Sequence, residues 1–349
     1  MVGSAAGESS SVESRGVIGA TVRDYDVYGS FTNRGQISAS AAVGDAAGDL
    51  AYSWIHHTYG VRLNDVYGGF ANEGTISASA VAGGALGADS YVEVDGIYGV
   101  YLEEIPSFSN TGAISASVTA GSASGENAIV EIYDVYGAYL DYGAPSFENE
   151  GTIGVNVQAG DNADIYQVTA VYLYDDTTLN NSGTISTAIT AGQGAWIDDV
   201  AAVYADDSTF TINNTGDIYL SIDSPYADSE VTRAAGIVFN DAVASITNTG
   251  AIYVTSNAGI HDVRTLAAIG SDVTFVDSFS LVFGSPGIED EPIYIDGAST
   301  LDLNDANLIA RAGNALLFNT PYVVIENDGG AVTGEFGGLV AAIVNPDIT

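Results

Sequence analysis

A short element of the form Asn-x-Gly-x-Ile recurs seven times in this chain. Its copies begin at Asn33, Asn72, Asn110, Asn149, Asn181, Asn214 and Asn248. Successive copies are 39, 38, 39, 32, 33 and 34 residues apart, so one structural unit is copied along most of the sequence. Repeats of this period form solenoids or arrays, in which neighbouring units share one continuous core. The repeat therefore constrains the architecture more than the length of 349 residues does.

Each unit contains three segments with the pattern of short strands. The Ile of the motif opens an alternating segment, as in Ile114-Ser-Ala-Ser-Val118, in which every second side chain points inward. A second strand precedes the motif, and its inward side chains form two rows of equivalent positions. The first row is Val61, Val100, Ala138, Val171, Val203 and Ile237, and the next is Leu63, Leu102, Leu140, Leu173, Ala205 and Phe239. A third strand carries an aromatic residue, at Phe70, Phe108, Phe147 and Phe210.

Strands that are apolar on one side cannot bury that side within a single unit. Coiling the chain so that equivalent strands stack in parallel closes a shared core. We expect the Asn-x-Gly element to form the corner between strands, because Asn tolerates left-handed backbone and Gly supplies a positive φ. Stacked Asn side chains can then form an amide ladder. The prediction is an all-β chain, a right-handed parallel β-helix (β-solenoid) of eight or nine coils with three short strands per coil.

The period varies along the chain and sets the expected boundaries. Residues 1–16 are small and polar and are predicted to form an N-terminal tail or cap. Residues 17–285 are predicted to form the regular β-helix repeats, and residues 286–349 irregular C-terminal coils.

The charge excludes several classes of partner. The chain has 45 acidic residues, seven Arg and no Lys, which gives a net charge of −38. Nucleic-acid binding and direct docking on anionic lipid both need clustered basic residues, so neither is expected. A strongly acidic surface stays soluble and attracts divalent cations. There is no Cys, so neither disulfides nor thiolate metal sites can form.

The repeat resembles the passenger region of bacterial autotransporters. The resemblance lies in units such as Asn110-Thr-Gly-Ala-Ile-Ser-Ala116 and Asn181-Ser-Gly-Thr-Ile-Ser-Thr187, and it covers roughly residues 17–260. In that family a β-helical passenger crosses the outer membrane through a barrel and is displayed or released, commonly for adhesion. The resemblance implies an extracellular or cell-surface location, reached through an export signal and anchor outside this sequence. No barrel follows at Val344-Asn-Pro-Asp-Ile-Thr349, so the export route is an expectation from the resemblance alone.

A row of tyrosines is the candidate ligand-binding surface. The outward position beside the core rows reads Arg23, Arg62, Tyr101, Tyr139, Tyr172 and Tyr204. Four tyrosines stacked along one face would form a flat, hydroxylated strip suited to sugar rings or to a partner surface. Cross-strand aromatic pairs also stabilise sheets without any ligand, so a purely structural role is the alternative.

Paired acids after the tyrosine row are the candidate calcium ligands. Asp175, Asp176, Asp206 and Asp207 are expected at matching places on adjacent coils, and calcium prefers several hard oxygen ligands. The alternative is that they form solvated acidic turns. No other cofactor is expected. His56 and His57 are expected in a loop with Trp54 and to point apart, which disfavours a metal shared between them.

The leading hypothesis is a non-enzymatic extracellular rod, acting as an adhesin or surface-display scaffold. Its partner would be a host or matrix surface made of carbohydrate or protein. One alternative is a self-assembling sheath or filament, since small outward residues give a flat face; these are Ser38, Ser40, Ser77, Ser79, Ser115 and Ser117. Another is a polysaccharide lyase or hydrolase, with carboxylates in excess but only Arg62 and Arg233 as plausible cations on the same face.

Overall fold

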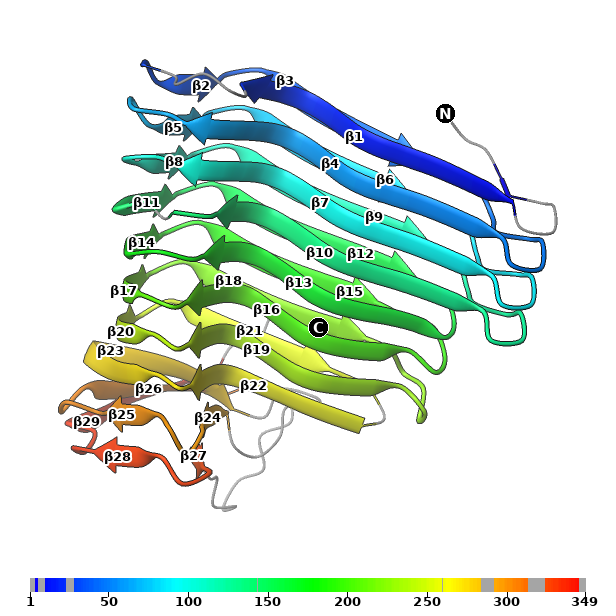
Figure 1. Cartoon of the computed structure of the whole chain (residues 1–349). Coiled ribbons are helices and arrows are strands. Elements are labelled where there is room, and N and C mark those ends of the chain that lie inside the picture. Colours follow the sequence, from blue (N-terminus) through cyan, green and yellow to red (C-terminus); the bar gives the residue numbers. More distant parts are fainter. Residues whose placement is uncertain are drawn as a thin grey trace.

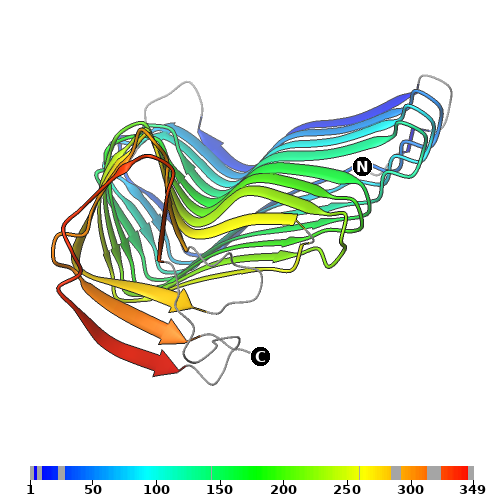
Figure 2. The same ribbon diagram turned by 90° about the horizontal axis from the view of Figure 1, so that it is seen from below.

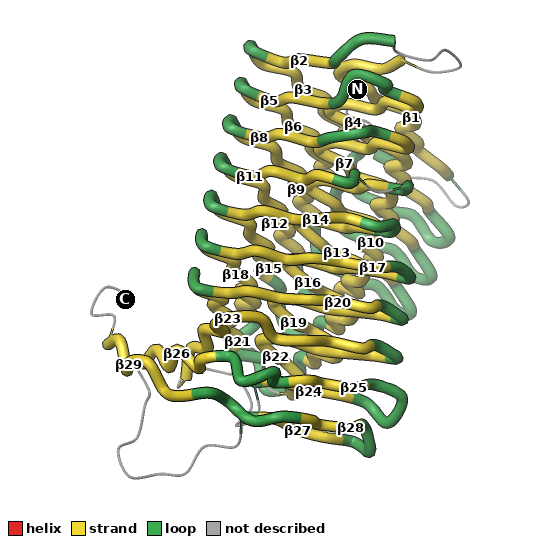
Figure 3. Tube along the Cα trace, turned by 90° about the vertical axis from the view of Figure 1, so that its left-hand side faces the viewer, coloured by secondary structure: helices red, strands yellow, loops and turns green. Residues whose placement is uncertain are grey.

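The computed structural model describes residues 4–5, 10–22, 28–142, 144–258, 260–283, 292–312 and 324–344. The chain is a right-handed parallel β-helix, as the repeat predicts (Figure 1). The described part contains strands and loops and no helix (Figure 3). It therefore contains no helix long and apolar enough to cross a bilayer. Residue Arg23 lies outside the described residues.

In the first seven coils the first sheet contains the longest strand of each coil, and all of the pairs in this sheet are parallel. Its ten strands make ten rungs, one more than the upper expectation. In spatial order they are β1 (Ser11–Val22), β4 (Tyr52–Asp65), β7 (Tyr91–Glu104), β10 (Ile129–Leu140), β13 (Ala163–Leu173), β16 (Trp196–Asp206), β19 (Glu230–Asn240), β22 (Ile260–Ile269), β24 (Ile293–Ile295) and β27 (Ile325–Asn327).

The second sheet carries the residues that precede the Asn-x-Gly corner. Its main path is β2 (Phe31–Asn33), β5 (Phe70–Asn72), β8 (Phe108–Asn110), β11 (Ser146–Asn149), β14 (Thr177–Asn181), β17 (Thr209–Asn214), β20 (Val243–Asn248), β23 (Asp272–Phe283), β25 (Thr300–Asp302) and β28 (Ala331–Thr333). Two further strands extend it from β23, namely β26 (Asn307–Ala312) and β29 (Gly338–Val344).

The third sheet follows the corner and consists of the alternating segments. It contains β3 (Gln36–Ala42), β6 (Thr75–Val81), β9 (Ala113–Ala120), β12 (Thr152–Ala159), β15 (Thr184–Thr190), β18 (Asp217–Asp223) and β21 (Ala251–Ser256). In β9 the side chains of Ile114, Ala116 and Val118 are buried and the intervening serines are half-buried, as the alternation predicts.

The core consists of ladders that run the length of the rod. Both predicted inward rows of the first sheet are in register and fully buried, from Val61 to Ile237 and from Leu63 to Phe239. In the second sheet Phe31, Phe70, Phe108 and Phe147 stack with ring centroids 5.3, 5.1 and 4.1 Å apart. Phe210 lies in β17 as predicted, but it pairs with Thr177, and Leu179 is the residue that pairs with Phe147, so the stack of Phe rings ends at Phe147.

The motif asparagines form the expected amide ladder inside the rod. Each Asn side chain from Asn33 to Asn214 donates from Nδ2 to the Oδ1 of the next Asn, at 2.7–2.8 Å. Asn248 ends the ladder by donating to the carbonyl oxygen of Ser280 at 2.9 Å. All seven side chains are buried, so the ladder satisfies polar groups that would otherwise be costly to bury.

The expected backbone role of the motif residues is wrong. Neither the asparagines nor the glycines of the motif have a positive φ. Glycine is required instead because consecutive coils approach closely at this corner. A Cβ atom on Gly74 would lie 2.1 Å from the carbonyl oxygen of Gly35, and one on Gly112 would lie 2.0 Å from that of Gly74. Close stacking, and not left-handed backbone, explains the Gly of the motif.

The long strands begin earlier than the sequence pattern suggests. His56 and His57 lie within β4 and not in a loop, so that expectation is wrong. The strand was missed because residues 52–58 are aromatic and polar outside while Ser53 and Ile55 point inward. At the N-terminus β1 already begins at Ser11. The domain boundaries at 16 and 285 stay predictions.

Candidate functional site

The first sheet bends near the middle of its strands, and its outer face is concave in cross-section (Figure 2). At the bend one residue in each of β1, β4, β7, β10, β13, β16 and β19 is skipped by the pairing between neighbouring strands. The skipped residues form a row with positive φ: Gly16, His57, Gly96, Asp134, Gln167, Asp199 and Arg233. Left-handed backbone at these positions accompanies the bend of each strand, and we call these seven residues the bulge row. Three residues of this row, Asp134, Gln167 and Asp199, line a pocket on the concave face.

A second break in the pairing, three residues later, brings two sheets close together. It falls at Gly60, Gly99 and Gly137 and, in later coils, at Ala170 and Ala202. A Cβ atom on Gly99 would lie 2.5 Å from the Gly137 carbonyl oxygen and 2.9 Å from Cγ2 of Ile114 in the third sheet. Glycine therefore allows the first sheet to approach the third closely. We call the contact at Gly60, Gly99 and Gly137 the glycine waist, and it lies beneath the concave face.

Two rows of tyrosine run along the concave face. The predicted strip is in register across the coils, from Tyr101 through Tyr139 and Tyr172 to Tyr204. Its rings stack with centroids 5.2, 4.8 and 5.3 Å apart and planes within 15° of parallel. Both faces of Tyr139 and Tyr172 are thus covered by neighbouring rings. The strip presents ring edges and hydroxyls to a ligand, and not the flat surface expected from the sequence.

An inner row of tyrosine lies deeper and is buried. Tyr59, Tyr98 and Tyr136 stack with centroids 5.0 and 5.4 Å apart. This row ends at Tyr136, because the next positions in register are Thr169, Ala201 and Ala235. No aromatic ring follows Tyr136 in the stack, although Tyr172 packs edge-on against it with a 73° angle between planes.

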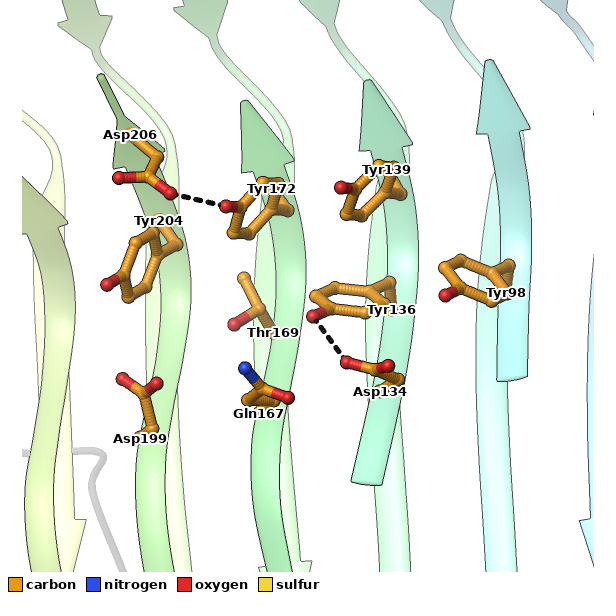
Figure 4. Close-up of a pocket in the computed structure, with 10 residues that line it drawn as sticks. All are labelled: Tyr98, Asp134, Tyr136, Tyr139, Gln167, Thr169, Tyr172, Asp199, Tyr204 and Asp206. Carbon is orange, nitrogen blue, oxygen red and sulfur yellow. Dashed lines mark hydrogen bonds between the residues drawn. The ribbon is translucent and has the colours of Figure 1, made fainter. Parts of the chain in front are cut away.

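The end of the inner row opens a pocket of about 310 Å³ (Figure 4). Its wall is formed by the Tyr136 ring on one side and by Tyr172 and Tyr204 on another, over the buried Thr169. The bulge row contributes Asp134, Gln167 and Asp199 at its edge; Tyr98, Tyr139 and Asp206 also line it. The volume is at the small end of ligand pockets and corresponds to a single ring or side chain.

The pocket is lined by hydroxyls and carboxylates that pair with one another. Tyr136 donates to Asp134 at 3.0 Å, and Tyr172 donates to Asp206 at 2.5 Å (Figure 4). Burial raises the pKa of Asp134 above its usual value despite that hydrogen bond. Burial also raises the pKa of Asp199, against the attraction of Arg233. Burial, together with the neighbouring carboxylates, raises the pKa values of Tyr139 and Tyr172, so both hydroxyls stay protonated and able to donate.

Arg62 and Arg233, the candidate cations of the lyase or hydrolase alternative, both lie on this sheet and both have acidic partners. Arg62 lies over the rings of Tyr59 and Tyr101, 5.1 Å from each centroid, and 3.6 Å from Glu103. Arg233 donates two hydrogen bonds to Asp198. The Asp198 pKa is lowered because the hydrogen bonds from Arg233 and Thr232 outweigh the effect of burial.

The four predicted calcium ligands are offset by one position between coils. The pairing in register ends at Leu173 and Ala205. Asp206 follows Ala205 directly, whereas Asp175 comes two residues after Leu173, so the two acidic pairs do not occupy equivalent positions. Each carboxylate accepts hydrogen bonds: Asp176 from Ser208 and from the Thr209 amide, Asp207 from Tyr174. Calcium binding at these residues stays a prediction.

The sequence contained a signal for the pocket that the repeat alignment did not use. The residues of the inner row stand at the start of each aligned strand and change from Tyr to Thr and Ala at Thr169. That change marks the gap. Asp134 and Asp199 could not be found in the same way, because they lie on the bulge and interrupt the period of two.

No protein-family model, curated protein or solved structure matches this chain.

Proposed function

We propose that this chain is a non-enzymatic binding rod that acts as an adhesin or surface-display scaffold outside the cell. Its ligand is a carbohydrate chain, one ring of which enters the pocket beside Tyr136. The observation that carries the proposal is the gap in the inner tyrosine row, where Thr169 and Ala201 stand in place of two further rings. The resemblance of the repeat to autotransporter passengers supports the location at the cell surface.

The surroundings of the gap suit a sugar ring. An apolar face of the sugar can stack on the side of Tyr136 that faces Thr169, where the inner row does not continue, beside the edge-on ring of Tyr172. Gln167, Asp206 and the hydroxyl of Tyr172 lie around it and can exchange hydrogen bonds with sugar hydroxyls. The other sugar rings of the carbohydrate would lie along the outer tyrosine row, whose hydroxyls and ring edges repeat once per coil.

The charge of the pocket restricts the class of carbohydrate. Asp134, Asp199 and Asp206 line it, and no basic side chain is among the described residues that do. Anionic polymers would be repelled, whereas neutral and amino sugars would not. We therefore propose a neutral or amino polysaccharide as the ligand and not a uronic acid polymer.

The test is incubation of the purified chain with neutral, amino and uronic acid polysaccharides, followed by size-exclusion chromatography. We expect co-elution with a neutral or amino polymer of unchanged length, and no co-elution with the uronic acid polymer. Adding calcium tests the predicted ligands Asp175, Asp176, Asp206 and Asp207 in the same experiment. A shortened polymer would contradict the non-enzymatic assignment and favour the hydrolase or lyase alternative.

Two matched variants locate the binding. Tyr136→Leu removes the ring that forms the wall of the pocket, and we expect it to abolish co-elution. Tyr253→Leu removes one ring of a stacked pair on the third sheet, where Tyr219 and Tyr253 have centroids 5.0 Å apart, and should leave binding unchanged. Equal binding by both variants would contradict the assignment of the pocket.

A further inference from the structure

A second polar cluster lies on the same sheet, on the other side of the bulge row from the tyrosine pocket. Register places His56 of β4 beside Asp95 of β7, and Glu93 points to the same outer face two residues before Asp95. All three side chains are partly buried, with 14–19% of their surface exposed. His, Cys, Asp and Glu are the usual metal ligands. In the described part of the chain, His56, Glu93 and Asp95 are the one set of three such residues whose ligand atoms all lie within 4.8 Å of one another.

The distances within the cluster fit a small metal ion. His56 Nδ1 lies 3.2 Å from Asp95 Oδ2 and 3.8 Å from Glu93 Oε1. Nitrogen and oxygen ligands bind zinc at about 2.0–2.2 Å in a tetrahedron, which places neighbouring ligand atoms about 3.4 Å apart. The three side chains therefore already approach three corners of a coordination sphere, with the imidazole offering the nitrogen that faces both carboxylates.

The neighbouring residues hold one ligand and add negative charge. The Tyr133 hydroxyl donates to Glu93 Oε1, and an outer hydrogen bond of this kind orients a metal ligand. Glu131 follows Glu93 in the same outward row and accepts a hydrogen bond from Tyr91. Like charges at adjacent positions of a sheet are unfavourable. Among the described residues, His56 is the one basic side chain paired with Glu93 or Asp95, so a divalent cation would supply the missing positive charge.

We propose that His56, Glu93 and Asp95 bind a divalent first-row transition ion, with Zn²⁺ as the probe. An imidazole ligand favours such ions, whereas Ca²⁺ and Mg²⁺ prefer all-oxygen sites. Three protein ligands leave further positions of the ion open to water or to a ligand on the concave face. The site is independent of the carbohydrate proposal, since none of its residues lines the tyrosine pocket.

The experiment is a calorimetric titration of the chain with Zn²⁺ in excess Mg²⁺, which occupies weak acidic sites. We expect one tight equivalent of Zn²⁺. His56→Asn should weaken it by at least about tenfold, and Tyr133→Phe by about tenfold through loss of the hydrogen bond to Glu93. Asp164→Asn is the matched control, because Asp164 stands in the same outward row two coils beyond Glu93, and it should bind as the wild type does.

A second readout does not depend on any variant being folded. The chain has three histidines, so their side-chain nitrogen signals can be followed individually by NMR in the wild-type protein. Zn²⁺ should shift the Nδ1 signal of His56 at one equivalent. Absence of that shift, or equal Zn²⁺ affinity for His56→Asn and Asp164→Asn, would overturn the proposal and leave His56 as part of an ion pair only.

Discussion

Adjacent residues of this rod can have opposite environments, as Asn180 and Asn181 do. Asn181 is buried, donates to Asn214 and accepts from Asn149, both at 2.7 Å. Asn180 is half-buried on the outer face and donates to Glu148 at 2.7 Å. The two residues therefore allow the amide ladder to be tested against a matched control.

We expect Asn181→Ala to lower the free energy of unfolding by about 2–3 kcal/mol, because it leaves a buried donor and a buried acceptor unpaired. Asn180→Ala should cost less than about 1 kcal/mol, since water can replace its partners. Chemical denaturation followed by circular dichroism measures both. Equal losses would show that the buried ladder contributes no more than a surface hydrogen bond.

The raised pKa of Asp199 predicts a pH-dependent effect. Burial raises this pKa above the ordinary value for Asp, so the folded state binds the proton more tightly than the unfolded state. That contribution to stability is fully present below the unfolded pKa and is lost as pH rises through the folded pKa. Asp199→Asn removes the dependence and tolerates the positive φ of 57°, so its Tm should exceed the wild-type Tm at pH 7. The difference should shrink as pH falls toward 4.

Asp176→Asn should change the Tm at pH 7 in the opposite direction and serves as the control. Hydrogen bonds from Ser208 and the Thr209 amide lower the Asp176 pKa, so its contribution to stability is present above the unfolded pKa and is lost on acidification. The variant should therefore be less stable than the wild type at pH 7. A Tm for Asp199→Asn below that of the wild type at pH 7 would contradict the assigned burial cost.

Which residues face inward could be predicted, and which backbone conformations they adopt could not. The rows from Val61 to Ile237 and from Leu63 to Phe239 follow from alternation alone, because a period of two fixes the face of every residue in a regular strand. The positions of Tyr136 and Asp134 were not predicted, because Asp134 belongs to the bulge row, which interrupts the alternation of inward and outward side chains. A row of residues as different as Gly96, Asp134 and Gln167 has no common sequence signature.

At the level of elements, the glycine waist and the bulge row together shape the concave face. Gly99 lies where the first sheet touches the third, and Gly154 lies on the outer face of the third sheet itself. A Cβ atom on Gly154 would lie 3.1 Å from the side-chain hydroxyl of Ser186, which can rotate away, and 3.7 Å from the Ser186 carbonyl oxygen, an ordinary contact distance. The two glycines sit in strands but have different steric surroundings.

We expect Gly99→Ala to destabilise the chain by about 1–3 kcal/mol, because the new methyl group would overlap backbone of the next coil and Ile114. Gly154→Ala should instead stabilise it by about 0.5–1 kcal/mol, through the lower entropy of the unfolded chain. Thermal and chemical unfolding of the two variants decide this. A neutral Gly99→Ala would mean that the sheets are not in close contact at the waist.

The order of the strands was predictable at this level, whereas the number of coils and the strand lengths were not. The spacing of the Asn-x-Gly-x-Ile copies fixes one turn of the helix per unit. The strands of the first sheet are not short, because β4, β7, β10, β13, β16 and β19 each contain 11–14 residues. The N-terminal halves of these strands could not be predicted from the sequence, because aromatic and acidic residues such as Trp54 and Glu93 occupy their outward positions.

At the level of the whole molecule, the net charge of −38 opposes the compact state. The screening length falls from about 30 Å in 0.01 M salt to about 10 Å in 0.1 M salt. We therefore expect the Tm to rise as NaCl is increased over this range, because repulsion between distant coils is screened. Differential scanning calorimetry measures the change, and a Tm that is flat or falling would contradict it.

The same salt series separates the rod from the self-assembling alternative. A monomeric rod should keep one elution volume on size-exclusion chromatography at every salt concentration. Association that grows with salt would favour the sheath or filament hypothesis, with the serines at 38, 40, 77, 79, 115 and 117 as the contacting face.

The most direct test of the account is to complete the inner tyrosine row with Thr169→Tyr. The new ring would follow Tyr136 in the stack and fill the pocket of about 310 Å³ from within, while the fold and the outer tyrosine row remain. Thr169→Ser is the matched control that leaves the pocket open. Titration calorimetry with the polysaccharide that co-elutes with the wild type should show binding by Thr169→Ser and none by Thr169→Tyr. Undiminished binding by a folded Thr169→Tyr would show that the ligand does not occupy this pocket.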